Sequence, residues 1–200
     1  VGAGHTEQEF AAMGVPFAER GAITDEVLDT LVTIWTEPDP VFEGEYFRIS
    51  GLAVDPRPVQ QPRPPIHVGG NSKPALRRAA RFDGWQPNPT NWDISGIPAS
   101  MDYIRAQDSF RGKEDSFDVN WLSGPDGVDL PDGFAAASPT QLRGYRDRLT
   151  EAYCGTYREY GITRTAARAP LAIASVAEFL DWLGWFAAEV IPAVNPSDPS

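Results

Sequence analysis

The sequence lacks the features that mark several large classes of protein. Cys154 is the only cysteine, so neither a disulfide within the chain nor a cysteine-based metal cluster is expected, and a reducing, cytoplasmic setting fits best. No apolar run approaches the ~18 residues that a membrane-spanning helix needs, and no charged segment followed by an apolar one opens the chain. We therefore expect a soluble protein with no membrane partner and no visible export signal.

Positive charge and histidine are also scarce. The chain has 17 lysine and arginine residues against 28 aspartate and glutamate residues, and the resulting net charge of -11 repels phosphate backbones. We therefore expect no nucleic-acid partner. His5 and His67 are the only histidines and lack the spacing of zinc ligands, so no catalytic zinc site is predicted. Scattered carboxylates could still bind magnesium, which leaves a metal-assisted hydrolase as an alternative.

The length and composition of the chain allow one domain. With 200 residues, of which 42% are hydrophobic, the chain can bury a sizeable core. We assign residues 1–194 to a single domain and residues 195–200 to a frayed tail. The chain opens at Val1, without a methionine, on what resembles the end of a buried strand. We interpret this as a chain whose N-terminal portion is absent.

Segments typical of strands and of helices alternate along the chain. Expected strands cover residues 1–4, 65–70, 83–87 and 117–122, and an extended excursion covers residues 41–59. Expected helices cover residues 6–14, 24–36, 71–81, 97–110, 138–161 and 175–191. This alternation predicts an α/β fold with a parallel sheet covered by helices. A complete (β/α)8 TIM barrel takes ~250 residues, so we predict such a barrel with about three N-terminal strand-helix units missing.

Local signals predict where several helices begin. The segments Ser138–Gln141 and Ser175–Glu178 have the spacing of capping boxes. A helix that begins at Thr24 would place Asp25 and Glu26 in its first turn, where the helix dipole favours anions. In the last helix, apolar residues recur at helical spacing and predict a buried face: Val176, Phe179, Leu180, Leu183, Ala187 and Val190.

The segment Gly69-Gly70-Asn71-Ser72 follows an expected interior strand and precedes a helix. In parallel α/β folds the strand ends and the following helix N-termini meet at one rim, which offers backbone N–H groups to anions. The two glycines would let a ligand approach the backbone, and Asn71 and Ser72 add polar side chains. The segment therefore predicts a phosphate site. A tight turn in which Asn71 or Ser72 only caps the helix explains the same residues equally well.

A second turn of this kind opens the chain. Gly2-Ala3-Gly4 precedes His5, whose imidazole would stand at the mouth of a barrel and could bind or donate a proton near neutral pH. A structural surface histidine is the competing interpretation. Arg77 and Arg78, on the helix after the glycine turn, are expected to be solvated, with a phosphate contact as the alternative.

Six segments occur in the same order as in a known family: Phe10–Thr36, Phe42–Phe47, Pro56–Gln60, Pro65–Ser72, Ala75–Arg81 and Asp83–Trp85. Together they closely resemble luciferase-like monooxygenases, especially the branch that uses coenzyme F420. The resemblance is dense over residues 1–87 and weaker beyond. Residues 161–170, where the family enters its last apolar strand, would make a poor buried strand.

The resemblance implies a (β/α)8 barrel that holds a flavin or deazaflavin where the strands end and transfers hydride between this cofactor and a small organic substrate. Flavin-using members activate dioxygen for monooxygenation. Coenzyme F420 is the expected cofactor and FMN is the alternative. The resemblance is also compatible with a homodimer. The residues that match the family's cofactor contacts are Gly69, Gly70, Asn71 and Ser72 at the phosphate and Gly2, Ala3 and Gly4 beside the ring.

The role of His5 and the missing N-terminal units both bear on the expectation of a cofactor-dependent enzyme. His5 falls where related enzymes carry an acidic or aromatic residue, so its catalytic role is a hypothesis about this chain. A cofactor-free barrel remnant with a structural or binding role is the alternative from a different class, motivated by the missing N-terminal units.

Overall fold

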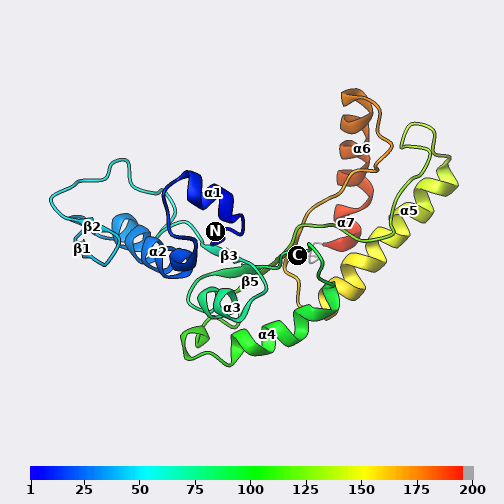
Figure 1. Cartoon of the computed structure of the whole chain (residues 1–200). Coiled ribbons are helices and arrows are strands. Elements are labelled where there is room, and N and C mark those ends of the chain that lie inside the picture. Colours follow the sequence, from blue (N-terminus) through cyan, green and yellow to red (C-terminus); the bar gives the residue numbers. More distant parts are fainter. Residues whose placement is uncertain (196–200) are drawn as a thin grey trace. The chain divides into compact units, whose positions relative to one another are not determined.

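A computed structural model describes residues 1–195 and divides the chain into two compact units (Figure 1). The first unit comprises Val1–Asn88 and Ala99–Phe117, and the second comprises Pro89–Pro98 and the chain from Asp118 onward. The single domain predicted over residues 1–194 is thus shared between two units. Residues 196–200 of the expected tail lie outside the described residues.

The first unit contains short strands, each near a helix. Its helical segments are α1 (Glu7–Ala12), the 3-10 turn η1 (Phe17–Glu19), α2 (Arg20–Thr36), α3 (Lys73–Ala79), most of α4 (Ile97–Arg105) and η3 (Asp108–Phe110). Its strands are β1 (Phe42–Glu43), β2 (Arg48–Ile49), β3 (His67–Gly69) and β4 (Gly84–Gln86). The antiparallel pair β1 and β2 is the extended excursion predicted over residues 41–59. The core includes Leu28, Val68, Trp85 and Ile104, which are almost fully buried.

Strand β3 has a backbone partner on each side. It pairs in parallel with β4, with Val68 opposite Trp85. On the other side the Val1 ammonium group donates to the His67 carbonyl at 2.7 Å, and the Gly69 N–H donates to the Val1 carbonyl at 2.7 Å. Val1 thus bonds to His67 and to Gly69, the residues before and after Val68. This is the hydrogen-bond pattern of two parallel strands. The α/β class is therefore confirmed, and Val1 lies beside β3 as the end of a strand would.

Helix α2 begins at Arg20, four residues before the predicted start at Thr24, so Glu26 is not in its first turn. The Glu26 carboxylate instead accepts hydrogen bonds from the N–H groups of Glu45, Tyr46 and Phe47, at 2.9, 2.7 and 2.6 Å. Desolvation raises the pKa of Glu26, but the bonds from these three amides outweigh it and leave the pKa below its usual value. The carboxylate therefore clamps the turn between β1 and β2 onto α2.

We expect Glu26→Gln to release this turn, because the new amide group would face three N–H donors with only one acceptor oxygen. Hydrogen exchange of residues 44–47 should quicken, whereas Glu43→Gln, at an exposed carboxylate of the same hairpin, should leave it unchanged. Since the pKa of Glu26 is lowered, the clamp is intact above the usual glutamate range and weakens as pH falls through the lowered pKa. If residues 44–47 exchange no faster in the Glu26→Gln variant than in the parent chain, this interpretation is contradicted.

The second unit is mainly helical. Its elements are η2 (Ile94–Gly96), β5 (Asp118–Trp121), α5 (Pro139–Glu151), η4, a π-helix over Ala152–Tyr157, β6 (Arg164–Thr165), α6 (Val176–Glu189) and α7 (Ile191–Val194). Strands β5 and β6 pair in parallel, with Asn120 opposite Arg164. Strand β6 is short and exposed, as predicted for the poor strand within residues 161–170.

Two predictions about the second unit have different outcomes. The capping box of Ser138 and Gln141 is present. At α6 only half of the predicted box forms: the Ser175 hydroxyl accepts from the Glu178 N–H at 3.1 Å, but the Glu178 carboxylate accepts from the N–H groups of Ala135 and Ala174.

The apolar face predicted for the last helix is largely exposed. Val176 is 76% exposed and Leu180 is 59% exposed, whereas Trp182 and Phe186 are buried. Of the predicted stripe, Val190 alone is buried, and Trp182 and Phe186 form most of the packing surface instead. Within residues 1–195, no helix has both the length and the apolar character that crossing a bilayer requires.

Candidate functional site

The two segments predicted to contact a cofactor leave the sheet of the first unit at the same end. Because Val1 pairs alongside Val68, residues 2–5 continue from a strand end next to the one from which residues 70–72 continue. Sequence reasoning placed both segments on one rim without showing that they are neighbours. The structure brings them together through two backbone hydrogen bonds.

The backbone requires glycine at some positions of these two segments and not at others. Gly70 has a φ of 113° and Gly4 a φ of 78°, a conformation that L side chains rarely adopt. A Cβ atom on Gly4 would also lie 2.7 Å from the Phe10 ring. Gly69 is different, because a Cβ there would make ordinary contacts, at 3.5 Å from the Val1 carbonyl oxygen and 3.8 Å from that of Gln86. The backbone thus requires glycine at positions 4 and 70, and no such requirement holds at position 69.

The amides of the two glycines at the turn are already used by the sheet. The Gly69 N–H donates to Val1, and the Gly70 N–H donates to the Gln86 carbonyl at 3.1 Å. The prediction that position 70 offers a free amide is therefore wrong. The physical reason is that β3 pairs on both sides, so backbone hydrogen bonding continues one residue beyond the strand.

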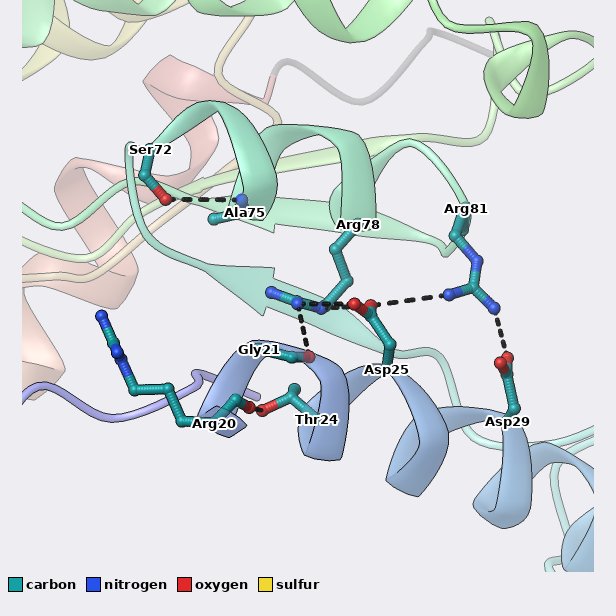
Figure 2. Close-up of polar contacts among 9 residues, drawn as sticks. All are labelled: Arg20, Gly21, Thr24, Asp25, Asp29, Ser72, Ala75, Arg78 and Arg81. Carbon is teal, nitrogen blue, oxygen red and sulfur yellow. Dashed lines mark hydrogen bonds and ion pairs between the residues drawn. The ribbon is translucent and has the colours of Figure 1, made fainter. Parts of the chain in front are cut away.

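The polar side chains of the turn are also engaged within the chain. The Ser72 hydroxyl accepts from the Ala75 N–H at 3.4 Å and caps α3, as Figure 2 shows. The Asn71 side chain donates to the Asn88 carbonyl at 2.8 Å and accepts from the Asn88 N–H at 2.9 Å. The Trp85 indole N–H donates to the Gly70 carbonyl at 2.8 Å. These bonds give the turn a defined shape and leave its side chains few donors for a ligand.

The available donors begin one residue after the glycines. Among residues 1–195, the backbone N–H groups of Asn71, Ser72 and Lys73 have no hydrogen-bond partner, and Pro74 has no N–H. Successive N–H groups that lead into a helix can surround an anionic oxygen. The turn can therefore offer three backbone donors to an anion.

Two cationic residues, Lys73 and Arg77, belong to helix α3, which follows these donors. The Lys73 ammonium lies 5.8 Å from the centre of the Tyr103 ring, and the Arg77 guanidinium donates to the Tyr103 hydroxyl at 3.1 Å. In the described part of the chain neither cation has a carboxylate partner within salt-bridge distance. In a chain with a net charge of -11, this makes the turn locally favourable to an anion.

Arg78 has a different role from either predicted one. Its side chain is 5% exposed, and its guanidinium donates to both Asp25 carboxylate oxygens, at 2.6 and 2.9 Å, and to the Gly21 carbonyl. Arg81 reaches the Asp29 carboxylate one turn further along α2 (Figure 2). The expectation of a solvated Arg78 was wrong, because its partners lie far away in the sequence. These ion pairs hold α3, and with it the glycine turn, against α2.

His5 is exposed and makes no hydrogen bond or ion pair with any other residue that the structure describes. The structure therefore places the imidazole near the rim without orienting it. Sequence reasoning missed the residues that shape the turn from elsewhere, which are Trp85, Asn88 and Tyr103. Nothing in the local sequence signals such contacts, since each depends on how a later segment folds back.

Comparison with known proteins gives a consistent result. The model of the luciferase-like monooxygenase family matches residues 1–123. The FMNH(2)-dependent dimethylsulfone monooxygenase of Pseudomonas putida is 34% identical over 115 residues, which cover 56% of this chain and 31% of that protein. An uncharacterised protein of Mycobacterium tuberculosis is 34% identical over 124 residues, covering 62% of this chain and 41% of that protein. The matched part of the chain thus covers less than half the length of each of these relatives.

Solved structures share the fold at lower sequence identity. The monooxygenase RslO1 from Streptomyces bottropensis superposes with a TM-score of 0.69 at 19% identity, over 96% of this chain and 67% of that one. The coenzyme F420-dependent tetrahydromethanopterin reductase from Methanopyrus kandleri superposes with a TM-score of 0.50 at 17% identity, over 81% of this chain and 50% of that one. At these identities the likeness concerns the fold alone.

Proposed function

Because the chain belongs to the luciferase-like monooxygenase family, we propose that it forms the cofactor-binding part of an oxidoreductase that uses FMN or coenzyme F420. The observation that carries the proposal is that the family match over residues 1–123 contains both segments that leave the sheet side by side. A relative that is 34% identical uses FMNH(2), which favours FMN over the coenzyme F420 expected from sequence. A small organic molecule would be the substrate.

The residues present fit the phosphate end of such a cofactor. The free N–H groups of Asn71, Ser72 and Lys73 would bind the phosphate oxygens, and the Arg77 guanidinium would add charge nearby. Gly70 supplies the backbone conformation of the turn, and Gly69 presents no side chain beside it. A bound flavin or deazaflavin supplies the redox chemistry by accepting and donating hydride, while the protein supplies orientation and electrostatics.

The segment from Gly2 to His5 would serve the ring end of the cofactor. Gly2, Ala3 and Gly4 would leave room beside the ring, and the His5 imidazole would donate or accept a hydrogen bond there. Because His5 has no partner of its own in the described residues, it is available for this bond. The (β/α)8 barrel, a cytoplasmic location and a homodimer belong to the same proposal, with the fold likeness to RslO1 supporting the barrel.

A titration of the chain with FMN and, separately, with coenzyme F420 tests the proposal. We expect saturable binding of one of them, a shift in its ring absorption band, and no such behaviour with riboflavin, which lacks the phosphate. His5→Ala should abolish the band shift yet weaken binding by less than about tenfold, because one hydrogen bond is lost while the phosphate contacts remain. Absence of binding by either cofactor would favour the cofactor-free alternative.

A further inference from the structure

The second unit contains a pocket that lies beyond the residues matched by the family model. It has a volume of about 560 Å³ and is lined by the π-helix η4, by β6 and by the end of α6 with α7. Ligand pockets in proteins commonly measure about 300–1,000 Å³. All of its lining residues belong to the second unit, so the pocket is independent of the cofactor turn.

The π-helix shapes one wall of this pocket. Such helices are rare and are frequent at functional sites, because the wider turn changes where side chains point. In η4 the Tyr153 and Tyr157 rings meet edge to face with centroids 5.6 Å apart, and the Tyr153 ring also meets Phe186 of α6. Ile191 of α7 lines the pocket and is 47% exposed. The walls are thus aromatic and aliphatic.

The charge of the lining differs from that of the chain as a whole. Among residues 1–195, the lining includes Arg158 and Arg164 and no aspartate or glutamate, although the chain carries a net charge of -11. Arg164 donates to the Asp118 carboxylate at 2.8 Å. The Arg158 guanidinium makes only a long contact, at 3.5 Å, with the Val194 carbonyl. With respect to the residues that the structure describes, Arg158 is therefore the cation that remains available to a ligand.

The pocket wall contains two buried phenols, those of Tyr153 and Tyr157. The Tyr153 hydroxyl is buried and has no hydrogen-bond partner among the residues that the structure describes. Burial raises the pKa of Tyr153 to about 12, so its hydroxyl stays protonated near neutral pH. Burial also raises the pKa of Tyr157, whose hydroxyl lies beside Trp121 and Thr165.

We propose that this pocket binds a carboxylic acid with an apolar body, whose carboxylate pairs with Arg158 and whose body packs against Tyr153, Phe186 and Ile191. The apolar walls would favour the apolar body of the ligand, and the positive charge of the lining would favour its carboxylate. In the described part of the lining, a cationic ligand would find no counter-charge and a polyanion would find one available guanidinium.

Calorimetric titration of the 200-residue chain with decanoate and with phenylbutyrate tests this proposal, with decanol as the uncharged control. We expect at least one acid to bind, decanol to bind more weakly, and the preferred acid to distinguish a linear from an aromatic body. Arg158→Gln should weaken acid binding by about tenfold, since a charge-assisted hydrogen bond is lost. Arg143→Gln removes a charge from another exposed arginine, on α5 and outside the pocket, and should leave acid binding unchanged.

Ile191→Trp provides a second, independent variant. Ile191 is half exposed, so the larger side chain can enter the pocket without disturbing the core, and circular dichroism should match the parent. It should abolish acid binding while leaving FMN or F420 binding intact. The proposal is overturned if neither acid binds, if decanol binds as well as the acids, or if Arg158→Gln and Arg143→Gln have equal effects.

Discussion

Asp25→Leu should lower the free energy of unfolding by roughly 3 kcal/mol, at the lower end of the range for breaking a buried ion pair. The reason is Arg78, whose side chain is 5% exposed and which would keep only the Gly21 carbonyl as a partner. The lower end applies because the Asp25 side chain itself is 44% exposed. Urea unfolding followed by circular dichroism measures this change.

Two further variants make the test specific. Asp29→Leu removes a neighbouring carboxylate on the same helix, but its partner Arg81 is 38% exposed, so the loss should stay below about 1 kcal/mol. Adding Arg78→Met to Asp25→Leu should recover much of the stability, because it removes the unpaired buried charge. If Asp25→Leu and Asp29→Leu lower the free energy of unfolding equally, the buried charge of Arg78 does not need Asp25 for stability.

The same ion pair links stability to the candidate site. Arg78 lies on α3, whose first residue follows the cap formed by Ser72 (Figure 2). If α3 is no longer held against α2, the N–H groups of residues 71–73 lose their fixed direction. Asp25→Leu should therefore weaken cofactor binding as well, even though Asp25 is predicted to contact no ligand.

Features that depend on neighbouring residues could be predicted from the sequence. The Ser72 cap, the Ser138 capping box and the turn that requires glycine at position 70 each involve residues within a few positions of one another. For such features the spacing contains most of the physical information. The family resemblance over the first part of the chain rests on the same kind of local motif and is confirmed.

Features that depend on distant residues could not be predicted in this way. The N–H of Gly70 is taken by Gln86, Arg78 is buried by Asp25, and the Glu26 carboxylate binds a hairpin about twenty residues further along. On α6 the apolar stripe and the aromatic pair Trp182 and Phe186 compete for the interior, and periodicity does not say which face wins. Of the predicted phosphate segment, Asn71 and Ser72 therefore keep backbone N–H donors, whereas Gly69 and Gly70 do not, and Lys73 is added.

Lys73→Pro should weaken phosphate binding by about tenfold or more while leaving the fold intact. Lys73 is the first residue of α3, a position that proline favours, and its N–H has no partner among the described residues, so folding loses no hydrogen bond. A bound phosphate would lose one charge-assisted donor, which is typically worth ~1.5–3 kcal/mol. Lys73→Gln is the matched control, because it removes the same charge and keeps the N–H.

The affinity ratio of these two variants for FMN or coenzyme F420 is the most direct test of the central claim that backbone donors at residues 71–73 hold the cofactor phosphate. We predict that Lys73→Pro binds about tenfold more weakly than Lys73→Gln, at equal thermal stability. Equal affinities would show that the turn does not grip the phosphate through its backbone, and the assignment of this site would then be withdrawn.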